Sequence, residues 1–108
     1  MADYAVFLTE DAEADLAEIT DHVERHDSRE RADCIFECIK EAILKLEVLP
    51  GRGRVVPELG EVGVLEYREV FFTPYRILYL VSEKRVYVHC IFDGRRDVEH
   101  VLSRRFLR

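Results

Sequence analysis

Pro-Tyr-Arg-Ile-Leu-Tyr-Leu-Val, residues 74–81, is the stretch of sequence that decides the fold class. Every second residue from Tyr75 to Val81 is aromatic or β-branched, which is the period-2 pattern of a β-strand. A second apolar run, residues 86–92, follows the polar turn 82–85 and stops at an Asp-Gly turn dipeptide. The two runs therefore predict an antiparallel hairpin at the centre of a sheet.

Arginine lies at the start of the first predicted strand, as Arg76, and just past the end of the second, as Arg95 and Arg96. An antiparallel hairpin brings these two points together, so we expect the three guanidinium groups to share one end of the sheet. Clustered guanidinium groups suit the recognition of phosphate or carboxylate. Arg76 also has a structural alternative, an ion pair at the sheet edge with Glu66, Glu69 or Asp97.

Helical periodicity and turn residues predict the other elements. Thr9 is expected to cap an amphipathic helix that ends near His26, and Asp27 or Ser28 a second helix that ends before Pro50. The remaining expectations are a strand at 4–8, an irregular link at 51–60, a strand at about 65–72 and a helix at 98–107. We therefore predict an α+β fold in which an antiparallel helical hairpin packs on a mainly antiparallel four-stranded sheet, as one domain of residues 1–108.

Composition predicts a small cytoplasmic protein. The 108 residues are 48% apolar, which suffices for one modest core. The sequence has neither an apolar run of membrane length nor a signal-peptide pattern, so we expect no membrane partner. Its three cysteines are an odd number, and free thiols in a reducing compartment are the simplest interpretation.

Charge divides the chain into two unequal halves. Residues 1–50 carry a net charge of −9, which solvated helix faces explain, whereas residues 51–108 carry +3. In the second half arginine outnumbers lysine ten to one, a preference that suits planar recognition more than solubility. An overall pI of about 5.2 argues against binding to nucleic acid.

Two further patterns have the spacing of possible binding sites. His22 with His26, and Cys34 with Cys38, have the i,i+4 spacing that can ligate zinc, but structural zinc sites usually draw cysteines from Cys-x2-Cys spacings. The Gly-Arg-Gly-Arg run at 51–54 lacks the Lys-Ser/Thr of a phosphate loop and leaves a helix instead of opening one. We therefore expect no metal and no cofactor.

The order of the motifs along the chain resembles a known family. A strand and two helices are followed by the Gly-Arg bend, Tyr-Arg-Glu at 67–69, Pro-Tyr-Arg-Ile-x-Tyr at 74–79, a strand, Gly-Arg-Arg-Asp at 94–97 and a terminal helix. This collinear order resembles the RelE/ParE superfamily of bacterial type II toxins from residue 4 to about residue 107. The resemblance implies a toxin in a hetero-oligomer with a small DNA-binding antitoxin, whose flexible C-terminal segment binds it.

The resemblance also separates two mechanisms. In RelE-type ribosome-dependent ribonucleases it places catalytic arginines at Arg76 and Arg96, with a tyrosine in the C-terminal segment. No tyrosine follows Arg96 here, and His100 is the candidate substitute as general acid or base, unless it is a solvent-facing helix residue. Three acidic residues between 93 and 99 would repel RNA phosphates. The pattern is therefore nearer the ParE branch, whose members bind DNA gyrase and need no active site.

The first hypothesis for function is therefore a toxin that inhibits DNA gyrase by protein–protein contact through the terminal helix and its segment 104–108. The alternatives are ribosome-dependent mRNA cleavage with Arg76, Arg96 and His100, and a non-toxic family member whose sheet binds a partner peptide. The residues expected to contact an antitoxin or target are Arg54, Arg68, Arg76, Arg95, Arg96, Arg104, Arg105 and Phe106.

Overall fold

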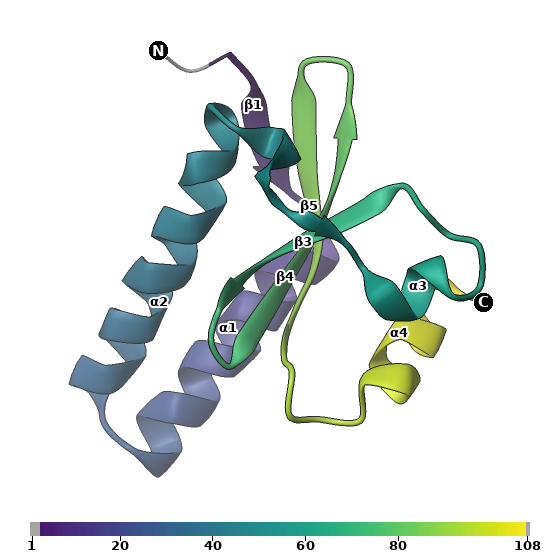
Figure 1. Ribbon diagram of the computed structural model, residues 1–108. Coiled ribbons are helices and arrows are strands. Elements are labelled where there is room, and N and C mark those ends of the chain that lie inside the picture. The colour runs from purple at the N-terminus through teal and green to yellow at the C-terminus, as the bar shows by residue number, and fades with distance from the viewer. Residues whose placement is uncertain (1–2, 108) are drawn as a thin grey trace.

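A five-stranded sheet runs through the centre of the computed structural model, which describes residues 3–107 (Figure 1). The strand order is β1-β5-β4-β3-β2. Neighbouring strands are antiparallel except for β1 and β5, which pair in parallel. The strands are β1 Ala5–Leu8, β2 Arg54–Val55, β3 Tyr67–Phe72, β4 Tyr75–Ser82 and β5 Arg85–Asp93.

Strands β4 and β5 form the hairpin that the sequence predicts. Tyr75, Ile77 and Tyr79 lie in the core cluster shared with the two long helices, which confirms the predicted alternation on β4. Leu78, between them, belongs to a second cluster on the opposite face. Strand β4 is therefore buried from both sides, and its side chains alternate between two cores.

A β-bulge interrupts the pairing of β4 with β5. Leu78 lies opposite Cys90 and Tyr79 lies opposite Val88, so His89 is an additional residue on β5. Side chains alternate between the two faces of a strand, and the additional residue shifts this alternation by one. The set of β5 positions that faces one core before the bulge therefore faces the other core after it.

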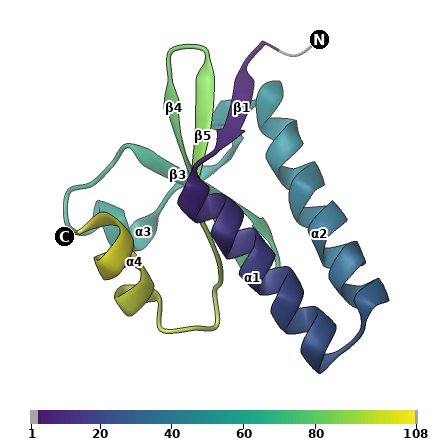
Figure 2. The same ribbon diagram turned by 180° about the vertical axis from the view of Figure 1, so that it is seen from behind.

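One face of the sheet is covered by the helical hairpin of α1, Glu10–His26, and α2, Arg29–Leu44 (Figure 2). Each helix begins at a side-chain cap. Thr9 and Ser28 each accept a hydrogen bond from the backbone N–H three residues further on, at 3.1 and 3.0 Å. Ser28, and not Asp27, is therefore the second cap. No helix within residues 3–107 has the length and hydrophobicity needed to cross a membrane.

Two shorter helices, α3 Pro57–Gly60 and α4 Val98–Phe106, pack on the other face. Asp97 caps α4 by accepting a hydrogen bond from the backbone N–H of His100 at 3.2 Å. The core beneath these helices consists of Val56, Leu59, Leu78, Cys90, Phe92 and Leu102. Helices therefore cover both faces of the sheet.

The α+β fold class is confirmed, but the prediction of four strands was one too few. The segment predicted as an irregular link contains a 3-10 turn at Pro50–Arg52, strand β2 and helix α3. Helix α2 also ends at Leu44, earlier than predicted, and a 3-10 turn at Lys45–Glu47 follows it. The buried Tyr79 hydroxyl holds the link in place, because it donates to the Pro50 carbonyl and accepts from the Gly53 N–H.

Candidate functional site

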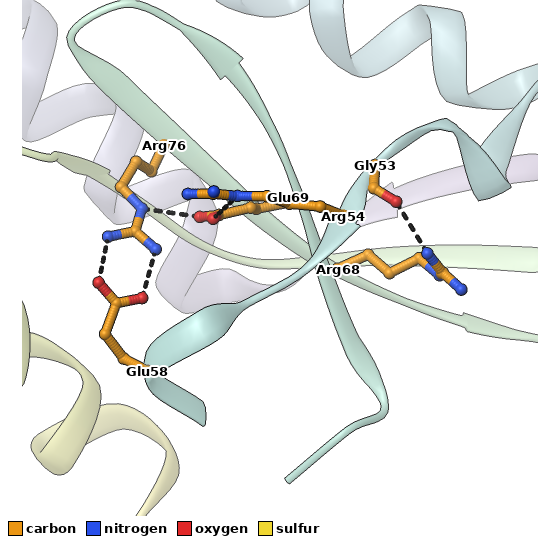
Figure 3. A network of polar contacts seen from close by, with 6 residues as sticks. All are labelled: Gly53, Arg54, Glu58, Arg68, Glu69 and Arg76. Carbon is orange, nitrogen blue, oxygen red and sulfur yellow. Dashed lines mark hydrogen bonds and ion pairs between the residues drawn. The ribbon is translucent and has the colours of Figure 1, made fainter. Parts of the chain in front are cut away.

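The guanidinium of Arg76 lies between strand β3 and helix α3 (Figure 3). Its Nε donates to Oε1 of Glu69 at 2.7 Å, and its Nη1 and Nη2 donate to the two carboxylate oxygens of Glu58 at 2.9 and 2.7 Å. Its outermost carbon lies 5.4 Å from the centre of the Phe92 ring. Only 7% of Arg76 is exposed, so its cation is held within the protein.

Glu69 continues this network toward strand β2. It is 1% exposed, and its Oε2 accepts from Nε of Arg54 at 2.8 Å. The Arg54 guanidinium extends outward over the ring of Phe71, at 5.1 Å from its centre. The chain Glu58–Arg76–Glu69–Arg54 thus alternates in charge, and its formal charges cancel.

The network depends on a glycine at position 53. A Cβ on Gly53 would lie 2.5 Å from both the Glu69 carbonyl oxygen and the Tyr79 hydroxyl, so any other residue would force the backbone apart. The Gly53 carbonyl also accepts from Nη1 of Arg68 at 2.8 Å. The Gly-Arg bend is therefore a close crossing of two segments, which brings Arg54 to Glu69.

Hydrogen bonds between Arg76 and Glu58 favour the ionised forms of both groups. Hydrogen bonds from Arg76 lower the pKa of Glu58 against the opposing effect of its partial burial. The bonds to Glu58, followed by those to Glu69, raise the pKa of Arg76 despite desolvation. The alternative of an ion pair between Arg76 and Glu69 is thus confirmed, whereas Glu58 was not foreseen as a partner.

Arg95 and Arg96 do not join Arg76 in one site. Arg95 is exposed and pairs with the Asp93 carboxylate at 2.7 Å, and this bond lowers the pKa of Asp93. Arg96 lines a cleft of about 400 Å³ against α1, together with Tyr75. Because Tyr75 and Arg76 are successive residues of a strand, they point to opposite faces. The three guanidinium groups thus share one end of the hairpin, as expected, but they form no single site, because Arg76 and Arg95 are bound to different carboxylates and Arg96 lines a cleft.

A separate ion pair joins the terminal helix α4 to helix α1, beside strand β5. Nη1 of Arg105 donates to both carboxylate oxygens of Asp15, at 2.9 and 3.1 Å, and its Nη2 donates to the His89 carbonyl at 2.7 Å. Asp15 Oδ2 also accepts from the backbone N–H of Ile91 at 2.9 Å. The pairing of β1 with β5 stops at Val88, so Asp15 and Arg105 satisfy backbone groups that β1 leaves exposed.

Comparison with known proteins identifies the family. Residues 6–98 match the model of the ParE toxin of type II toxin–antitoxin systems, parDE. The chain belongs to the ParE toxin family. No curated protein matches it in sequence.

Two solved structures confirm the ParE/RelE fold. The chromosomal ParDE toxin–antitoxin system from P. aeruginosa aligns with a TM-score of 0.71 and 22% identity, over 84% of this chain and 96% of that chain. The toxin–antitoxin complex RelBE2 from Mycobacterium tuberculosis aligns with a TM-score of 0.61 and 20% identity, over 86% of this chain and 93% of that chain.

Within this ParE-family fold, the three residues of the ribonuclease hypothesis do not converge. Arg96 and His100 line one cleft of about 310 Å³ beside α4, and Arg104 lines it as well. Arg76 is not part of that lining, because Glu58 and Glu69 hold it beneath α3. The geometry thus offers a bound arginine and a separate cleft, which Asp15 and Glu18 line together with the basic residues, instead of one catalytic constellation.

The other residues expected at the terminal helix differ in exposure. Phe106 is half-buried and packs on Tyr67, with 4.6 Å between the ring centres. Arg105 is engaged by Asp15, whereas Arg104 and Leu107 lie on the surface. Arg108 lies outside the described residues. Glu58 and Asp15 were not predicted as arginine partners, because nothing in the local pattern marks a contact across 18 or 90 residues.

Proposed function

We propose that this ParE-family toxin inhibits DNA gyrase by protein–protein contact, without an active site of its own. The observation that carries the proposal is the state of Arg76, whose three nitrogens all donate to the carboxylates of Glu58 and Glu69. A guanidinium bound in this way cannot stabilise the charge that develops on a phosphate during cleavage unless the network opens. Binding to a protein target requires no such group.

The terminal helix is the surface that we assign to gyrase. It presents the exposed Arg104 and, just after its end, Leu107, which is 44% exposed. Arginine is enriched at protein–protein interfaces relative to the rest of the surface, and the exposed leucine adds apolar area beside it. Arg105 and Phe106 contribute by fixing the helix on the sheet, through Asp15 and Tyr67 respectively.

We further propose a cognate antitoxin as the partner in a cytoplasmic hetero-oligomer. The ParDE and RelBE2 structures that share this fold are both toxin–antitoxin assemblies. Four exposed apolar side chains along α2 and the turn after it offer a surface that a partner segment would cover: Phe36, Leu44, Val48 and Leu49. Of the arginines predicted to contact an antitoxin or target, we assign the exposed Arg54, Arg95 and Arg96 and the half-buried Arg68 to acidic residues of that segment.

The second candidate is ribosome-dependent mRNA cleavage. It is favoured by one observation, the cleft that Arg96, His100 and Arg104 line together. An imidazole beside two guanidinium groups can serve acid–base chemistry on a phosphodiester. A third candidate, a non-toxic member that only binds a partner peptide, needs neither the cleft nor the terminal helix.

Induction of the chain alone in its host tests these functions. We expect growth arrest with filamentation and an SOS response, and relief of the arrest when the small protein encoded beside it is co-expressed. Early collapse of translation with cleaved messages would favour the ribonuclease, and then His100→Ala should abolish cleavage. Normal growth at verified expression would favour the non-toxic member.

A further inference from the structure

Within the network Glu58–Arg76–Glu69–Arg54, the two glutamates differ in exposure. Its side chain is 34% exposed, whereas that of its neighbour in the network, Glu69, is fully buried. Helix α3 is anchored by Leu59 and by Val56 just before it, both of which are fully buried. The Glu58 carboxylate can therefore leave Arg76 by rotation of its own side chain, while α3 stays in place.

Arg76 is positioned by contacts that do not involve Glu58. Its Nε is fixed by the buried carboxylate of Glu69, and its guanidinium lies over Phe92. Its stem also passes close to Gly94, where an added Cβ would lie 3.0 Å from the Arg76 Cδ. A guanidinium held along its length in this way would keep its two outer nitrogens aimed outward if Glu58 moved away. Such a preorganised fork matches a carboxylate in bidentate geometry.

We propose that Arg76 is the cation of a binding site for a carboxylate side chain of another polypeptide. In the free protein the chain's own Glu58 occupies this site (Figure 3). The site goes beyond the proposed contact with gyrase, since it lies beneath α3 and not on the terminal helix. An incoming carboxylate would take over both hydrogen bonds from Glu58 and leave the charge of the network unchanged. A partner carboxylate must therefore bind Arg76 more favourably than Glu58 does before it can displace Glu58.

The surroundings favour a carboxylate over a phosphate chain. Outside the network of ion pairs, residues 57–69 add two exposed glutamates, Glu61 and Glu66, and one arginine, so a nucleic acid would bring its phosphates against a net negative charge. A carboxylate places a single negative charge at the position that Glu58 now fills. It also matches the planar fork of Arg76, to which both oxygens of Glu58 already bond at 2.7 and 2.9 Å.

Chemical rescue of Glu58→Ala tests this site, with sodium acetate as the probe and sodium chloride at equal ionic strength as the reference. Deletion of the carboxylate empties the site and leaves Arg76 with one partner. Acetate should then raise the melting temperature of Glu58→Ala in a saturable way, by about 3 °C at a concentration near twice its Kd. The wild type should not respond, because Glu58 is already bound. Glu61→Ala is the matched control, since Glu61 is exposed and lies on the same segment.

Three results would overturn the proposal. The first is that acetate does not stabilise Glu58→Ala, and the second is that it stabilises Glu61→Ala equally. The third is that inorganic phosphate at equal ionic strength stabilises Glu58→Ala more than acetate does. Should Glu58→Ala fail to fold, Glu58→Ser carries the same test, because its short side chain also leaves the site empty. The readout is thermal stability, so failure here is distinguishable from failure of the gyrase hypothesis.

Discussion

Replacement of Arg76 by alanine should be among the most destabilising single changes in this chain. It removes a 2.7 Å hydrogen bond from Glu69, a carboxylate that is 1% exposed and would retain only Arg54 as its charged partner. Removal of one member of a buried ion pair typically costs about 3–5 kcal/mol. Glu58 adds little to this figure, because its carboxylate can be hydrated at the surface once released.

Thermal and urea unfolding of Arg76→Ala measure this loss. A cost of about 3 kcal/mol corresponds to a fall in melting temperature of at least about 12 °C in a chain of this size. Arg85→Ala is the matched control, since Arg85 is exposed at the start of β5, and it should change stability by less than about 0.5 kcal/mol. A double variant, Arg76→Met with Glu69→Met, should recover part of the loss because no charge is left buried. A loss below about 1 kcal/mol for Arg76→Ala would refute the reasoning.

Three further predictions concern other buried groups. Arg105→Met should lower the free energy of unfolding by about 1–3 kcal/mol in urea, because the part-buried Asp15 loses its charged partner; unchanged stability would show that water replaces it. Burial, with a smaller effect of Arg105, lowers the pKa of His89, so the folded state binds fewer protons than the unfolded state. The free energy of unfolding should therefore be highest above pH 6.5 and fall as the pH decreases below it. His89→Gln should remove this contribution to the pH dependence of the melting temperature. Ellman's reagent should modify the exposed Cys34 in the folded protein but Cys90 only after unfolding, because Cys90 is buried and its pKa is raised to about 12; equal rates would contradict the packing.

Local sequence patterns predicted the larger elements correctly. The alternation along β4 and the Thr9 cap of α1 depend on residues within a few positions of one another, so a single sequence contains them. Strand β2 has only two residues and therefore no measurable period. Its place in the sheet comes from the approach of Gly53 to Glu69 and Tyr79, which only the folded chain contains.

The candidate site was predicted less completely than the fold. Glu69 was among the partners expected for Arg76, because it lies on the neighbouring strand. Glu58 was missed, because its position on α3 depends on a segment that appeared irregular in sequence. Arg76, Arg95 and Arg96 do share one end of the sheet, as expected, but Arg76 and Arg95 are bound to different carboxylates, which the order of the motifs does not reveal.

In vitro supercoiling by DNA gyrase from the native host, with the purified chain added, tests the central claim most directly. We predict a dose-dependent loss of supercoiling that is reversed by the small protein encoded beside the chain. Cell-free translation should continue under the same conditions. Unimpaired gyrase together with translation that stops on cleaved messages would contradict the account and assign the chain to the ribonuclease mechanism.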